Sequence, residues 1–260
     1  MTYDVAIIGN GILGLSTAFS LSLLDPTLKI AIVAPLSREG SASVAAGAML
    51  NAFAELTSTS LKSKAGEEKF ENALKASKKW NSWLQSINDF LPEAENLTIQ
   101  DGTFVILNAK SGILDSENFN AILNTLKQRQ ESYEEVDPQS IPGLNPVEDC
   151  RPLRSLYLPK EGCINSGSVI NALQYILQKH FNVTFIHQKA LSFNVKGHAV
   201  VSLNTDQGEI ISARNFVIAA GSYSQKLIDT LPQISRNIPR LLSGMGCSVV
   251  VSQDPKHSVH

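Results

Sequence analysis

Cysteine and histidine are scarce in this sequence, and the few present are scattered. The 260 residues include three cysteines and five histidines. Cys150, Cys163 and Cys247 form no CxxC pair and no even set, so neither a disulfide framework nor a zinc site is indicated. The histidines form no close pair of ligands either. We therefore expect no metal centre in this protein.

The sequence also lacks a strong excess of charge. It has 22 Lys and Arg residues against 24 Asp and Glu residues, spread without a basic block or an acidic tail. This balance gives no electrostatic case for a nucleic-acid partner. No uncharged apolar stretch is long enough to cross a bilayer, and no basic region precedes the apolar N-terminus as in a signal peptide. We therefore expect a cytoplasmic protein. The 43% of hydrophobic residues suits one large or two smaller domains.

What the sequence does contain is a glycine loop between a strand and a helix. Residues 3–8 are a short apolar run that predicts a buried strand, residues 12–24 predict a helix stopped by Asp25-Pro26, and residues 29–33 predict a second buried strand. Such a strand–helix–strand unit is the size of a right-handed crossover. Between the first strand and the helix lies Gly9-Asn10-Gly11-Ile12-Leu13-Gly14, a GxGxxG in the context that a dinucleotide-binding loop requires.

Each glycine of the loop has a predicted role. Gly9 allows the tight turn, Gly11 leaves room for a pyrophosphate beside the backbone, and Gly14 lets the helix pack closely on the strand. The N–H groups at the helix start, from Ile12 onward, favour phosphate charge. A tight strand–helix turn without a ligand is the alternative interpretation.

One part of the dinucleotide motif is missing. The motif places an acid about twenty residues after the loop, where it binds the ribose hydroxyls. That position falls on Ala34, and the nearest acids lie before the second strand or beyond its end. Ser37 or Arg38 could substitute for the acid. Arg38 also suits a 2′-phosphate, which keeps NADP open as the ligand.

The rest of the chain alternates helices and strands. Apolar residues at helical spacing predict helices at 67–90, 116–129 and 166–180. Short apolar runs predict strands at 99–107, 183–186, 199–203, 209–212, 216–219 and 248–252, with residues 206–208 as a hairpin connection. Strands of the dinucleotide type therefore lie towards both ends, and a region of different character, residues 52–160, interrupts them.

Two further stretches favour a flavin: residues 41–50, SASVAAGAML, and residues 215–224, NFVIAAGSYS. With them, the sequence resembles the FAD-dependent oxidoreductases of the D-amino-acid oxidase type, which include glycine oxidase and sarcosine oxidase-like enzymes. That family opens with strand–GxGxxG–helix, continues with a Ser-x-Ala-Ala-Gly segment, and later has an apolar strand ending in Ala-x-Gly. All three occur here in order, and Glu161-Gly162-Cys163 also resembles a mid-chain segment of the family.

The resemblance implies an α/β fold. Residues 1–51 and 161–230 would form a discontinuous Rossmann-like FAD-binding domain, of the second glutathione-reductase type. Residues 52–160 and 231–260 would form a helical insertion and part of a mainly antiparallel substrate domain, which we expect to be incomplete.

The resemblance also implies contacts with FAD, and small residues suit each of them because the backbone must approach the cofactor. The pyrophosphate would lie on Gly9, Gly11, Ile12 and Gly14. The ribityl chain would pass Ser41, Ser43, Ala45, Ala46 and Gly47, with Met49 and Leu50 near the isoalloxazine. The remaining contacts would be Ala190 at the adenine and Ala220 and Gly221 on the other side of the cofactor.

The activity implied is oxidation of the C–N bond of an amino acid or small amine, by hydride transfer to the flavin. Family members continue further, with a substrate-binding arginine and a last glycine loop that this sequence lacks, so no catalytic residue is assigned. Arg236, Arg240 and Tyr223 are interpreted as structural or surface residues. We expect a truncated or split member whose substrate domain a second chain could complete. An NAD(P)-dependent dehydrogenase and a non-catalytic FAD-binding subunit remain the alternatives.

Overall fold

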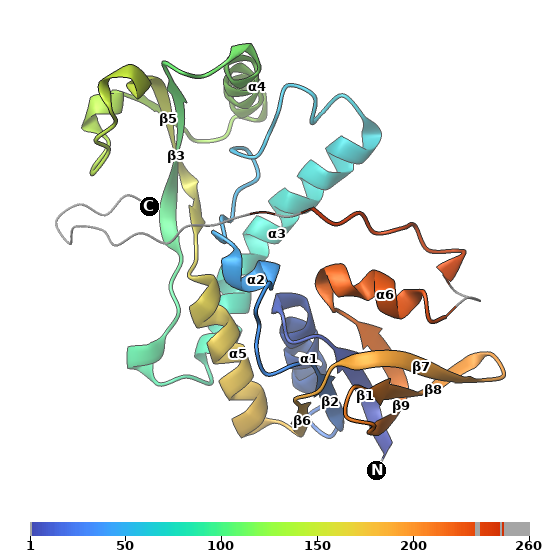
Figure 1. Ribbon diagram of the computed structural model, residues 1–260. Helices are drawn as coiled ribbons and strands as arrows, with labels where there is room; N and C mark the ends of the chain where they lie inside the picture. The colour runs from blue at the N-terminus through green and yellow to red at the C-terminus, as the bar shows by residue number, and fades with distance from the viewer. Residues whose placement is uncertain (1, 232–234, 245, 247–260) are drawn as a thin grey trace. The chain divides into compact units, whose positions relative to one another are not determined.

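A computed structural model describes residues 2–231, 235–244 and 246 (Figure 1). The chain divides into two compact units. The first contains residues 2–46, 90–92 and the described part of 166–248, and the second contains residues 47–89 and 93–165. The predicted strand at 248–252 and Cys247 lie outside the described residues.

The first unit is built on a six-stranded sheet with the order β6-β2-β1-β9-β8-β7. Four of its strands run parallel: β1 (Thr2–Ile8), β2 (Ile30–Val33), β6 (Val183–Ile186) and β9 (Ile210–Ile218). β7 (Ala190–Lys196) and β8 (Ala199–Thr205) extend the sheet in antiparallel fashion. The predicted β1–helix–β2 crossover is confirmed, as are the strand at 183–186 and the hairpin between β8 and β9.

The register of the parallel strands brings their carboxyl ends to one edge. Ile8 pairs with Val33 of β2 and with Ile218 of β9. The glycine loop, the end of β2 and the segment after β9 therefore leave the sheet together. The strands are apolar because helices cover a parallel sheet, and Ile7, Ile32 and Val33 are almost completely buried.

Two helices of the first unit follow the prediction to the residue: α1 (Ile12–Leu24) and α5 (Ser166–His180). They pack against each other. Phe19 of α1 has no exposed surface and makes edge-to-face contacts with Phe90 and Phe181, at ring-centroid distances of 6.0 and 6.2 Å. The short helices α2 (Ala42–Ala45), η4 (Gly221–Tyr223) and α6 (Ser224–Ile228) belong to the same unit.

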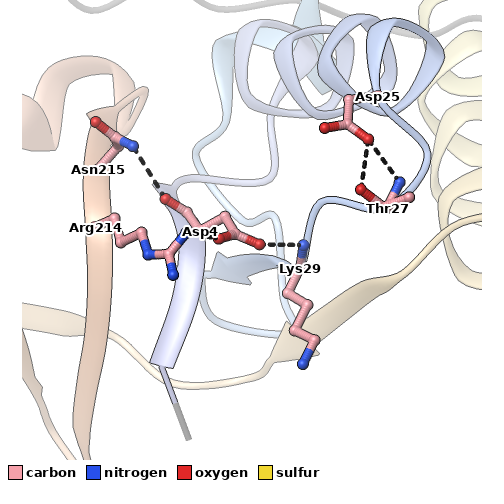
Figure 2. A network of polar contacts seen from close by, with 6 residues as sticks. All are labelled: Asp4, Asp25, Thr27, Lys29, Arg214 and Asn215. Atoms are coloured by element: carbon pink, nitrogen blue, oxygen red, sulfur yellow. Dashed lines mark hydrogen bonds and ion pairs between the residues drawn. The ribbon is translucent and has the colours of Figure 1, made fainter.

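At the opposite, amino end of the sheet, Asp4 of β1 forms hydrogen bonds with residues next to β2 and in β9 (Figure 2). Its carboxylate accepts the backbone N–H of Lys29 at 2.9 Å and a guanidinium N–H of Arg214 at 3.0 Å, while Asn215 donates to its carbonyl oxygen at 3.2 Å. These bonds explain why one prediction is wrong. Strands were expected at 209–212 and 216–219, but β9 continues through residues 213–215. These residues pair with β1, and the side chains of Arg214 and Asn215 contact Asp4 from within the strand.

The second unit contains a three-stranded antiparallel sheet and two long helices. The sheet has the order β3-β5-β4, with β3 at Gln100–Asn108, β4 at Glu134–Val136 and β5 at Pro152–Cys163. The helices are α3 (Lys64–Asn88) and α4 (Ile113–Arg129). The unit also contains three short 3-10 helices, Glu93–Glu95 (η1), Pro138–Ser140 (η2) and Glu148–Cys150 (η3). The core of this unit gathers Phe53, Phe70, Leu126 and Leu156.

The predicted boundaries in the second unit need correction. α3 begins three residues before 67, because Ser63 caps it by accepting the N–H of Gly66 at 3.1 Å. It ends at Asn88 rather than at 90. α4 likewise begins at Ile113, where the Asp115 carboxylate accepts the N–H of Gly112. No helix within the described ranges is long and apolar enough to cross a membrane.

Candidate functional site

The glycine loop is packed so tightly that two of its positions exclude a side chain. Gly9 has a φ of 118°, and a β-carbon there would overlap the carbonyl oxygen of Ala219. A β-carbon on Gly14 would overlap the carbonyl oxygen of Gly9. Both glycines are therefore required by close backbone approach, and Gly9 also by its left-handed conformation.

The start of α1 has no acidic residue beside its positive dipole end. Gly11 is the N-cap residue and offers no side-chain hydrogen bond, and the first turn contains no acid. The backbone N–H of Ile12 donates to the Ser43 hydroxyl at 3.1 Å, and a β-carbon on Gly11 would lie 3.1 Å from that same oxygen. Ser43 thus brings the small-residue segment onto the helix start, where N–H groups and the dipole favour an anion.

The rest of the small-residue segment is mostly exposed. Ser41 precedes the single turn of α2, and Ala45 is its last residue. The carbonyl oxygen of Ala46 accepts the hydroxyl of Ser166, at 3.2 Å. Gly47 has no atom within 4 Å of the place where its β-carbon would be. Most of the segment is thus exposed, and its predicted contact with a ligand stays a prediction.

Met49 and Leu50 belong to the second unit, where they pair with the end of β5. Met49 forms a bridge with Cys163, and the N–H of Leu50 donates to the carbonyl oxygen of Gly162 at 2.7 Å. Ala48, just before them, has a positive φ of 48°, which is uncommon for alanine. Met49 is 46% exposed, so its side chain is open to a bound group.

A buried carboxylate holds the chain directly after Met49 and Leu50. Glu161 is 6% exposed, and its carboxylate accepts the N–H groups of Ala52 at 2.7 Å, Phe53 at 2.5 Å and Ala54 at 3.1 Å. Burial raises the pKa of Glu161, against the lowering effect of those three hydrogen bonds, and the charge of Glu55 adds to the rise. The sequence indicated Glu161 only as part of a resembling segment, and its anchoring role was missed.

Three residues predicted to contact FAD lie beyond the ends of β9 and β6. The N–H of Ala219 donates to the carbonyl oxygen of Ile8 at 2.8 Å, which fixes Ala220 and Gly221 next to the loop. Gly221 has a φ of 56° and open space around its β-carbon position. Ala190 is the first residue of β7, pairs with Thr205 of β8 and is only 3% exposed, so the described structure leaves little of it accessible.

The end of β2 carries a cation where the motif has an acid. Ala34 is buried and its N–H donates to the carbonyl oxygen of Ile186. Arg38 instead contacts the loop. Its Nε donates to the carbonyl oxygen of Asn10 at 3.1 Å, and its Nη2 donates to the side-chain oxygen of Gln174 on α5. The hydroxyl of Ser37 accepts the N–H of Glu39 in its own exposed turn. Of the two predicted substitutes, Arg38 is the one that contacts the loop.

Tyr223, Arg236 and Arg240, which we interpreted as structural or surface residues, lie in environments of that kind. Lys189 and Lys226 lie over the ring of Tyr223, at 4.6 and 5.5 Å from its centroid. Arg236 and Arg240 are exposed. In the part of the chain that is described, no three His, Cys, Asp or Glu residues are grouped so that they could hold a metal ion.

A family model for FAD-dependent oxidoreductases, the D-amino-acid oxidase type, matches residues 4–260. The chain belongs to this family. The resemblance seen in the sequence, the α/β fold class and FAD as the family's cofactor are thereby confirmed. The loop fits such a group, since the start of α1 has no acid in its first turn and its N-cap residue, Gly11, carries no side chain.

Solved structures of the FAD-dependent oxidoreductase family share this fold. Glycine oxidase from Geobacillus kaustophilus has a TM-score of 0.71 at 18% identity, over 89% of this chain and 58% of its own. Glycine oxidase from Bacillus cereus ATCC 14579 has a TM-score of 0.69 at 21% identity, over 88% and 58%. Iminodiacetate oxidase from Chelativorans sp. BNC1 has a TM-score of 0.68 at 16% identity, again over 88% and 58%. The present chain therefore spans less than two thirds of the length of these relatives. No curated protein sequence matches it.

Proposed function

We propose that this chain is the FAD-binding part of an oxidoreductase that oxidises the C–N bond of an amino acid or a small amine. The observation that carries the proposal is the glycine loop, with the Ser43 hydroxyl on the N–H of Ile12 at the start of α1. The solved relatives named as glycine and iminodiacetate oxidases support the substrate class. FAD, when bound, supplies the acceptor for a hydride from the carbon beside the amine nitrogen.

In this proposal the glycine loop and the segments after β2 and β9 bind the cofactor. The N–H groups at the start of α1 that Ser43 does not accept bind the pyrophosphate, and Gly11 adds no side chain there. The exposed backbone of residues 45–47 approaches the cofactor, and Ala220 and Gly221 do so after β9. The segments 1–51 and 161–230 are thus proposed as the FAD-binding domain, and 52–160 and 231–260 as part of the substrate domain.

We also assign Met49 and Leu50 to the flavin ring. Their backbone is held on both sides: Leu50 donates to Gly162, and Glu161 binds the three N–H groups that follow. This double attachment supports a fixed position for Met49, whose side chain is exposed. Amino-acid oxidation requires such order, because hydride transfer depends on the orientation of donor and acceptor.

We further propose that turnover requires protein beyond these 260 residues, in a longer chain or in a second polypeptide. The support is the coverage of the relatives, which stops at 58% of their length. We assign no catalytic residue within the present sequence for the same reason. A cytoplasmic location stays a prediction.

The test is a titration of the purified chain with FAD, followed by visible absorbance and by flavin fluorescence. We expect a yellow protein with bound-flavin bands, and thermal stabilisation by FAD that NADPH does not match. Stabilisation by NADPH alone would contradict the proposal and favour a dehydrogenase. Bound FAD without turnover of small amines, with activity restored by a partner chain, would identify a binding subunit.

A further inference from the structure

The charge beside the glycine loop has the opposite sign to that of the usual dinucleotide site. A carboxylate at the end of the second strand normally accepts the ribose hydroxyls. Here that position is Ala34, which is 6% exposed and has no polar side chain. The charged residue that does contact the loop is Arg38, four residues further on.

Arg38 is held at the loop by two partners from distant parts of the chain. Its Nε donates to the carbonyl oxygen of Asn10, the residue between the first two glycines, at 3.1 Å. Its Nη2 donates to the side-chain oxygen of Gln174, which lies 136 positions away on α5. Asn10 in turn donates from its side chain to the carbonyl oxygen of Pro35, at 3.1 Å. The guanidinium is therefore oriented before any ligand arrives.

The guanidinium still has donors to offer. Of its five N–H groups, Asn10 and Gln174 take two. Arg38 is half-buried, and none of the ion pairs in the described residues includes it. It lies next to a helix start that also has no acid in its first turn. Arg38 and the start of α1 thus both offer donors here that favour oxygen acceptors and negative charge, although the exposed Glu39 follows Arg38 in the chain.

We propose that Arg38 recognises the adenosine ribose of the bound dinucleotide, as a donor in place of the missing carboxylate. The proposal rests on the proposed FAD site and adds to it the residue that reads the adenosine end. It has a specific consequence. A carboxylate at the ribose repels a 2′-phosphate, whereas Arg38 attracts one, so the site accepts 2′-phosphorylated adenosine.

The experiment measures binding of nucleotides to the full 260-residue chain by isothermal titration calorimetry. The probes are 5′-AMP, adenosine 2′,5′-bisphosphate and its 3′,5′ isomer, which carries the same charge. We expect the 2′,5′ isomer to bind at least about tenfold more tightly than the 3′,5′ isomer, as a charge-assisted hydrogen bond implies. In Arg38→Met that preference disappears, and FAD binding weakens by about tenfold or more. Arg38→Lys retains part of the preference.

Arg214→Met is the matched control. It removes the same charge, but at the amino end of the sheet beside Asp4. We expect it to leave all three nucleotide affinities unchanged. If Arg38 only braced the loop through Asn10 and Gln174, Arg38→Met would weaken the three nucleotides equally. Equal losses, or no preference in the wild type, would overturn the inference.

The results also separate this inference from the proposed function. A chain that binds FAD equally well with and without the Arg38 side chain contradicts the inference and leaves the FAD site in place. A chain that shows the Arg38-dependent 2′ preference but binds no FAD supports the inference and contradicts the proposed function. A chain that binds none of the nucleotides and no FAD overturns both.

Discussion

The carbonyl oxygen of Ala219 occupies the space that a β-carbon on Gly9 would need. The two residues follow the ends of neighbouring parallel strands, since Ile8 pairs with Ile218. The N–H of Ala219 donates to the carbonyl oxygen of Ile8, which keeps the two backbones together. The backbone of Ala219 therefore requires a glycine at position 9, whether or not a ligand is bound.

Gly9→Ala should destabilise the chain even without FAD. The alanine would need a φ of 118° and would overlap Ala219, so we expect the free energy of unfolding to fall by about 2–4 kcal/mol. Urea denaturation of the FAD-free protein measures this loss. A Gly9→Ala variant as stable as the wild type would show that the loop does not have this conformation in solution.

Ser43→Ala should weaken the start of α1. Its hydroxyl is the acceptor for the Ile12 N–H, and loss of a side-chain acceptor at a helix start typically costs about 1 kcal/mol. Denaturation of the FAD-free chain measures the change. Ser41→Ala is the control, because Ser41 makes no capping hydrogen bond with α2. Equal effects of the two substitutions would contradict the assigned role of Ser43.

Gly47→Ala should separate stability from cofactor binding. A β-carbon at this position meets no atom within 4 Å, so the free energy of unfolding without FAD should change by no more than about 0.5 kcal/mol. The same methyl group would obstruct the close approach of FAD that we propose. We expect weaker FAD binding by fluorescence titration. Unchanged affinity would remove Gly47 from the proposed contacts.

The secondary-structure elements that a clear local sequence pattern marks were predicted, and several elements without such a pattern were not. β1, α1 and β2 were predictable because their apolar runs are bounded by glycine or by Asp25-Pro26. β5 was missed, since Pro152, Pro159 and Glu161 interrupt its alternation. β4 and β7 were missed as well.

The candidate site shows the same division. The glycines and the small-residue segment were recognisable as motifs in the sequence. The contact between Ser43 and Ile12 joins residues 31 positions apart, and the one between Arg38 and Gln174 joins residues 136 apart. No local pattern predicts such contacts, because the register of the sheet and the packing of α5 decide which side chains meet.

Glu161 provides a prediction with a defined pH dependence. Burial raises its pKa above the usual value of 4.5, so the folded state binds this proton more tightly than the unfolded chain does. Its contribution to stability is therefore fully present below pH 4.5 and is lost as the pH rises through the raised pKa. Glu161→Gln lacks the titrating group. The free energy of unfolding of the wild type, minus that of Glu161→Gln, should thus be larger near pH 4.5 than at pH 7.

Glu161→Ala should be less stable than Glu161→Gln by at least about 2 kcal/mol, because it leaves the N–H groups of residues 52–54 without their acceptor. Urea denaturation at several pH values tests both points. A difference that grows towards neutral pH would mean that the three hydrogen bonds outweigh burial and lower this pKa instead.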